Sequence, residues 1–183
     1  MSNTIGARIV LEGEKEYRQA LKEITANQKE LRSEMKLCSS EFDGQQNSLA
    51  ALTRKHKILE KQIETQGRKV TLYTQRLEES QKAHEQAGQK VESLKAQLQT
   101  AEQEMDRLKN TTGTSAQALE QQEKTVENLK RALQGAEDDY VAAGTALTNW
   151  STSINNANAD LNKMNSDLQR TEQYMEEARN STD

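Results

Sequence analysis

The side chains in this sequence best suited to chemistry are its two histidines, His56 and His84, and its single cysteine, Cys38. All three occupy inward-facing positions of a heptad repeat, and the histidines are four heptads apart. In a parallel trimer each histidine would form a ring of three imidazoles, which could bind Zn²⁺ or an anion. A lone buried cysteine usually behaves as a small apolar side chain.

We favour a structural role for these polar positions. Polar residues within an apolar seam fix the register and the number of helices at some cost in stability. The sequence contains no paired carboxylates, nucleophile triad, CxxC pair or glycine-rich phosphate loop. We therefore expect no enzymatic activity, no cofactor and no metal site. The polar layers expected in the seam are Gln28, His56, Gln66, His84 and Gln122.

These positions belong to an apolar stripe that keeps the same heptad phase over most of the chain. With Leu21 as position a and Ile24 as position d, 19 of 23 a residues and 17 of 23 d residues are apolar, counting Ala and Cys. A 3.5-residue spacing keeps one face of a helix toward a partner, as in coiled coils. We call this a and d stripe the seam. Its large apolar residues, expected to contact neighbouring copies of the chain, are Leu21, Ile24, Leu31, Met35, Phe42, Leu49, Leu52, Leu59, Ile63, Val70, Leu77, Val91, Leu94, Leu98, Leu108, Leu119, Val126, Leu129, Leu133, Leu147, Trp150, Ile154, Leu161 and Leu168.

The composition agrees with a fibrous helical protein. Of the 183 residues 33% are hydrophobic and 3% aromatic, and there is no proline. Globular domains are about 45–50% apolar, and proline would break a helix interior. The net charge of −4, from 25 basic and 29 acidic residues, argues against a dedicated nucleic-acid-binding protein, despite the basic stretch 54–69. No stretch is apolar enough to span a membrane.

Four segments are predicted. Residues 1–13 form an arm in which 4–11 alternates with a period of two, which indicates a short strand or an extended segment, a frayed helical turn being the alternative. Coiled-coil helices are expected over 14–43, 49–110 and 116–179.

Polar, glycine-containing breaks separate these helices, and Ser48 and Ser115 are suited to cap the helices that follow. The heptad phase continues unchanged through both breaks. This continuity favours an all-α fold in which copies of the chain form a long, extended parallel coiled coil. Such a rod is about 240 Å long at 1.5 Å per residue. The alternative is an antiparallel hairpin that turns near Gly113.

The stripe is wider than the a and d positions alone. Several g positions are alanine, which suits three or more helices and favours a homotrimer over a two-stranded coil. These alanines are Ala20, Ala83, Ala118, Ala132 and Ala146.

Several stretches resemble the N-terminal region of tail tape measure proteins from tailed phages and prophages of Gram-positive bacteria. Their order extends over nearly the whole chain: 5–21 (IGARIVLEGEKEYRQAL), 33–37 (SEMKL), 41–43 (EFD), 52–53 (LT), 59–66 (LEKQIETQ), 149–150 (NW), 154–157 (INNA) and 159–164 (ADLNKM).

The resemblance implies a structural protein that lies extended in the lumen of the phage tail, sets tail length during assembly and leaves on genome ejection. It implies the host cytoplasm during assembly and the virion afterwards. The tail tube protein, a tail assembly chaperone or tail-end proteins are the implied partners. Family members are much longer, so we expect this chain to be an N-terminal fragment. The alternative function is a cytoplasmic coiled-coil spacer or adaptor that joins two binding modules.

Overall fold

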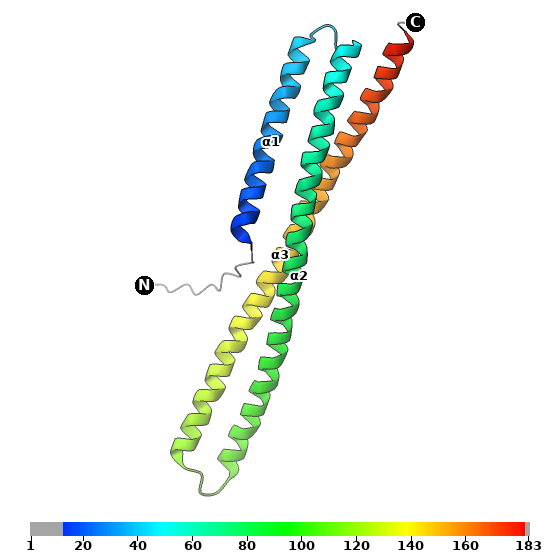
Figure 1. Cartoon of the computed structure of the whole chain (residues 1–183). Coiled ribbons are helices and arrows are strands. Elements are labelled where there is room, and N and C mark those ends of the chain that lie inside the picture. Colours follow the sequence, from blue (N-terminus) through cyan, green and yellow to red (C-terminus); the bar gives the residue numbers. More distant parts are fainter. Residues whose placement is uncertain (1–12, 182–183) are drawn as a thin grey trace. The chain divides into compact units, whose positions relative to one another are not determined.

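The computed structural model describes residues 13–181, which form three long helices. Helix α1 covers Glu14–Glu41, α2 covers Leu49–Asn110 and α3 covers Ala116–Asn180 (Figure 1). The chain divides into two compact units, and α2 and α3 each contribute one segment to both. We call 13–76 with 150–181 the bundle unit, and 77–149 the hairpin unit.

The bundle unit contains three helical segments around one core. Contacts between α1 and α2 pair Gln28 with Gln66 and Cys38 with Ala51, so the sequence numbers run in opposite directions. Contacts between α2 and α3 run in opposite directions as well. Helix α2 is therefore antiparallel to both α1 and α3, which are parallel to each other.

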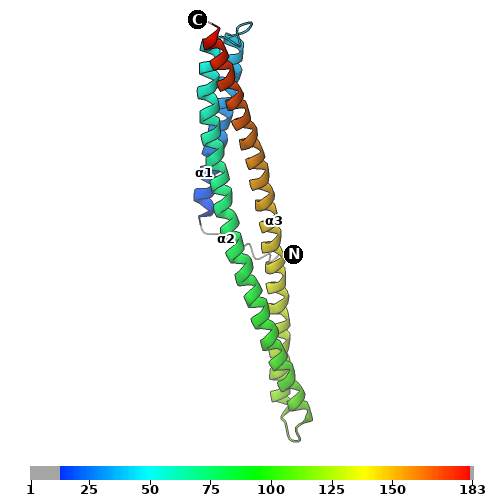
Figure 2. The same ribbon diagram turned by 90° about the vertical axis from the view of Figure 1, so that its right-hand side faces the viewer.

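The hairpin unit consists of the C-terminal part of α2 and the N-terminal part of α3. Lys95 pairs with Glu137 and Glu102 pairs with Lys130, so these two segments are antiparallel, as Figure 2 shows in green and yellow. The aligned segments place the seam of α2 against the seam of the same chain's α3.

Both predicted serine caps are confirmed. The hydroxyl of Ser48 accepts a hydrogen bond from the amide of Ala51 (3.3 Å), and that of Ser115 accepts one from Ala118 (3.2 Å). These bonds satisfy amides that have no partner inside the helix. The turn before each cap contains a glycine with positive φ, Gly44 or Gly113, a conformation that other residues rarely adopt.

The chain therefore reverses at both breaks, and the prediction of a continuous helical rod through them is wrong for the single chain. The preserved heptad phase did not prevent reversal, because the same stripe can face a neighbouring helix of its own chain. Intrachain pairing also avoids the entropy cost of association. The hairpin near Gly113, the alternative, is what the structure shows. The parallel coiled coil was expected between copies of the chain and stays a prediction; within the chain, α2 is antiparallel to α1 and α3.

The wide apolar stripe has a partner within the bundle unit. Three helices meet there and all three belong to one chain, whereas four of the five g-position alanines lie in the hairpin unit, where two helices meet. A trimer is thus not needed to explain the stripe in this unit. The predicted arm, 1–13, lies outside the described residues except for Gly13, which precedes α1 with φ 73°.

Candidate functional site

The seam forms the interior of both units. Among the large seam residues named from the sequence, Leu49 alone is exposed, with 41% of its surface accessible, and all the others are buried or half-buried. The fully buried ones are Ile24, Leu31, Leu52, Leu59 and Val91. The functional residues predicted as an intermolecular seam therefore already have partners within the chain.

A layer of polar side chains joins all three helices of the bundle unit. The amide of Gln28 on α1 donates to the side-chain oxygen of Gln66 on α2 (2.6 Å), and the amide of Gln66 donates to the carbonyl oxygen of Ala157 on α3 (2.8 Å). Gln66 is 1% exposed. Because a misaligned layer would leave these buried groups unpaired, the layer fixes the register of the three helices.

His56 links α2 to α3 within the same unit. Its Nε2 atom lies 3.1 Å from a carboxylate oxygen of Glu172 on α3, and its Nδ1 atom lies 3.5 Å from Glu60 on α2. In the single chain this imidazole faces two carboxylates and not two other imidazoles. The geometry is that of a helix-to-helix polar bridge.

A buried arginine docks the start of α1 onto α2. The guanidinium of Arg76 donates to the carbonyl oxygen of Gly13 (3.2 Å), lies 3.3 Å from the carboxylate of Glu14, and stands over the ring of Tyr17 at 4.4 Å from its centroid. The side chain of Arg76 is only 3% exposed. Tyr17 in turn meets Trp150 of α3 edge to face, with centroids 5.6 Å apart. One charged and aromatic cluster thus holds all three helices at this end of the bundle unit.

The environment of Tyr17 raises its pKa above the ordinary value of 10.0. Burial of the ring is the largest cause, and the neighbouring Tyr73 and Glu14 add to it, while the Arg76 guanidinium opposes them. Each of the first three disfavours the phenolate.

Stability should therefore depend on the ionisation of Tyr17 above pH 10. Below that pH the phenol is neutral in both folded and unfolded chains. As pH rises through the window between the unfolded and the folded pKa, the unfolded chain loses its proton first, so the free energy of unfolding falls. We expect urea unfolding at pH 9 and pH 11 to show a smaller loss of stability for Tyr17→Phe than for the unaltered chain. Tyr174→Phe, at an exposed position, is the matched control and should leave the loss unchanged.

In the hairpin unit, His84 and Tyr140 form one interhelical layer. Their rings stack with centroids 4.2 Å apart. Glycines on the opposing helix make room for each ring: a Cβ on Gly88 would lie 3.3 Å from the Tyr140 ring, and one on Gly144 would lie 3.4 Å from His84. Gly88 and Gly144 therefore allow close approach of the two helices.

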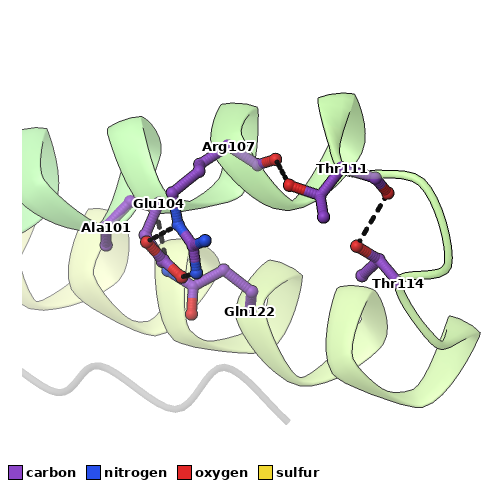
Figure 3. Close-up of polar contacts among 6 residues, drawn as sticks. All are labelled: Ala101, Glu104, Arg107, Thr111, Thr114 and Gln122. Atoms are coloured by element: carbon purple, nitrogen blue, oxygen red, sulfur yellow. Dashed lines mark hydrogen bonds and ion pairs between the residues drawn. The ribbon is translucent and has the colours of Figure 1, made fainter.

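The turn end of the hairpin unit is held by polar contacts (Figure 3). The amide of Gln122 on α3 donates to the carbonyl oxygen of Ala101 on α2 (2.8 Å). Within α2, Arg107 makes two bonds to Glu104, of 2.8 and 2.6 Å, and these hold the pKa of that carboxyl below its ordinary range. The hydroxyl of Thr114 donates to the carbonyl oxygen of Thr111 across the turn (3.0 Å).

Sequence reasoning missed a second stripe on α2. Ala51, Ile58 and Thr65, seven residues apart, are all buried, and Ile58 packs with Leu31 and Cys38 of α1. These are c positions of the heptad. The stripe was visible in the sequence and would have indicated that this part of α2 contacts two helices.

No group of three His, Cys, Asp or Glu side chains within residues 13–181 is placed to hold a metal ion. In the same range, no helix combines the length and the hydropathy that a membrane span requires. No family model, curated protein or solved structure matches this chain.

Proposed function

We propose that this chain is part of a phage tail tape measure protein, and that it converts from the folded-back form to an extended, in-register rod during tail assembly. The observation that carries the proposal is the heptad phase, which continues unbroken across two turns where the chain reverses. Reversal alone does not require a continuous phase. A helix that must also run straight through both turn segments requires a continuous heptad phase, because its apolar stripe must stay on one face.

The seam of the folded-back chain supports such a conversion. Extension would exchange contacts between α2 and α3 for contacts between copies, with the same side chains facing inward. Polar layers such as Gln28 with Gln66 and the bridge at His56 weaken the interior relative to an all-apolar core. Both reversals are short turns whose glycines are compatible with other backbone conformations.

In the extended form the helix acts as a ruler, because its rise of about 1.5 Å per residue is fixed. Several copies in register, three in our proposal, would measure together inside the tube, with the tail tube protein around them. The rod then sets the length at which the tube stops growing and is released on genome ejection. The proposal assigns no catalytic step to this chain.

A paired deletion in the parent phage tests the ruler. Removing 84–97 and 131–144 takes out two heptads from each arm of the hairpin unit. This deletion keeps the heptad phase and both partners of the Glu102–Lys130 pair, and it removes both partners of the Lys95–Glu137 pair. The 28 missing residues should shorten the tail by about 42 Å in electron micrographs.

The matched control is a duplication of the same two segments, which should lengthen the tail by the same amount. Phage that assemble tails of unchanged length from both variants would exclude the ruler. That result would favour the alternative, a spacer that joins two binding modules, for which tail length is irrelevant.

A further inference from the structure

Among the residues that the structure describes, none covers one side of the helix pair in the hairpin unit. Several of its bulky seam residues, among them Leu94, Leu98 and Leu129, are only half-buried, because two helices cannot fully enclose each other's apolar stripe. On the side of the helix pair that carries the e positions, ion pairs join α2 to α3, from Lys95 to Glu137 and from Glu102 to Lys130. A shallow groove of about 500 Å³ opens between α2 and α3, and the g positions Gln97, Glu104 and Thr125 line it together with Ala101 and Leu129.

In the bundle unit the corresponding side of α2 is occupied by a helix. Ile58 and Thr65 at c positions are buried there, and Gln62 at a g position donates to the carbonyl oxygen of Leu31 on α1 (3.4 Å). The c and g side of α2 thus accepts a helix in one unit and lies open in the other. An additional helix is the occupant whose shape fits the groove of the hairpin unit.

The charges along the c and g side of α2 indicate which helix fits the groove of the hairpin unit. Lys90, Gln97 and Glu104 are successive g positions of α2, so the first and the last are equally far from Gln97 and carry opposite charges. If a second α2 lies antiparallel with a two-fold axis at Gln97, Lys90 of each copy meets Glu104 of the other. Lys90 makes no ion pair within the described part of the chain, and the Glu104 carboxylate is already oriented by Arg107.

We propose that the hairpin unit is a docking surface for a second copy of this chain, which packs antiparallel through the groove to form a four-helix bundle. This packing forms two ion pairs per dimer, each between Lys90 of one copy and Glu104 of the other, symmetric about Gln97. On α3 the same side carries Thr125 and the small Ala118 and Ala132, which leave room for the partner hairpin. This dimer is independent of the tail function, and it differs from an in-register parallel rod, in which Lys90 would lie opposite Lys95.

Charge reversal in the full chain tests the docking. In sedimentation equilibrium we expect a dimer at micromolar concentration, weakened about tenfold by Lys90→Glu or by Glu104→Lys, and restored by the double variant. Glu92→Lys, an exposed b position on the other side of α2, is the matched control and should leave the dissociation constant unchanged. Circular dichroism verifies that each variant remains helical.

Cross-linking tests the direction of packing. In a Cys38→Ala background, an equal mixture of Lys90→Cys and Glu104→Cys chains treated with a short bismaleimide should give mostly mixed dimers. A monomer at all concentrations, an excess of like-with-like products, or a double variant as weak as the single ones would each overturn the proposal. None of these outcomes bears on tail length, so the proposed function can fail separately.

Discussion

Leu52→Ala is expected to lower the free energy of unfolding by about 3 kcal/mol, whereas Leu49→Ala should lower it by less than about 1 kcal/mol. Both leucines are seam residues of α2, three residues apart, and the substitution removes the same atoms. Leu52 is 2% exposed in the bundle unit, so its truncation loses transfer free energy and leaves a cavity. Leu49 is 41% exposed at the start of α2 and already contacts solvent.

The comparison distinguishes the folded-back chain from a parallel rod. In a rod, position a at Leu49 and position d at Leu52 both face the partner helices, so both substitutions would be costly. Urea unfolding followed by circular dichroism gives the two free energies, with equal slopes indicating that the unfolded states are alike. Equal losses of about 3 kcal/mol would contradict the exposure of Leu49 in the single chain.

Most of the buried residues were predictable from the sequence because burial follows the heptad stripe; three c positions and one g position of α2 are the exceptions. The positions of Ile24, Leu31 and Leu59 in that stripe predicted their burial, and the structure places them in the bundle core. Helix ends followed from local chemistry as well, since Ser48 and Ser115 cap α2 and α3 as expected. These properties depend on neighbours in sequence and on the helix period alone.

The relative direction of neighbouring helices was not predictable from the same stripe, because an apolar face fits a parallel and an antiparallel partner equally well. The information lies at the e positions, where Lys95 and Glu102 of α2 complement Glu137 and Lys130 of α3 only if the helices are antiparallel. Preserved phase across the turns pointed to the opposite conclusion.

The polar contacts of the candidate site were predictable only in part. Gln28 and Gln66 were identified as separate polar layers, yet their side chains belong to one layer that spans α1 and α2. Pairing of this kind depends on which helices are neighbours, and that follows from the reversal at Gly44. The sequence did not indicate that Arg76 is buried, because an arginine at a g position is usually solvated.

Arg76→Ala is expected to lower the free energy of unfolding by about 3 kcal/mol, through loss of a buried guanidinium that three groups of α1 engage. The carbonyl oxygen of Gly13 loses one of its two donors and keeps the Tyr17 amide, Glu14 loses a cation, and Tyr17 loses the group stacked over its ring. Arg76→Lys should recover only part of the loss, since an ammonium keeps the charge but lacks the planar fork.

Arg18→Ala is the matched control, because Arg18 also pairs with Glu14, at 2.7 Å, but its side chain is 64% exposed. Its removal should cost less than about 0.5 kcal/mol. A second measurement separates the charge of Arg76 from its packing. Since the guanidinium lowers the pKa of Tyr17, the tyrosine should titrate at higher pH in Arg76→Ala than in the unaltered chain when absorbance is followed under folding conditions. Packing loss alone would open the site to solvent and move that pKa downward.

The two readouts together locate the start of α1. A large loss of stability with a raised Tyr17 pKa requires that the first turn of α1 lies on α2 beside Arg76, as it does in the bundle unit. If Arg76→Ala and Arg18→Ala cost the same small amount, the first turn of α1 is not docked on α2. The Tyr17–Trp150 contact would then lack its anchor, and α1 would be joined to the bundle unit chiefly through its later layers, around Leu31 and Cys38.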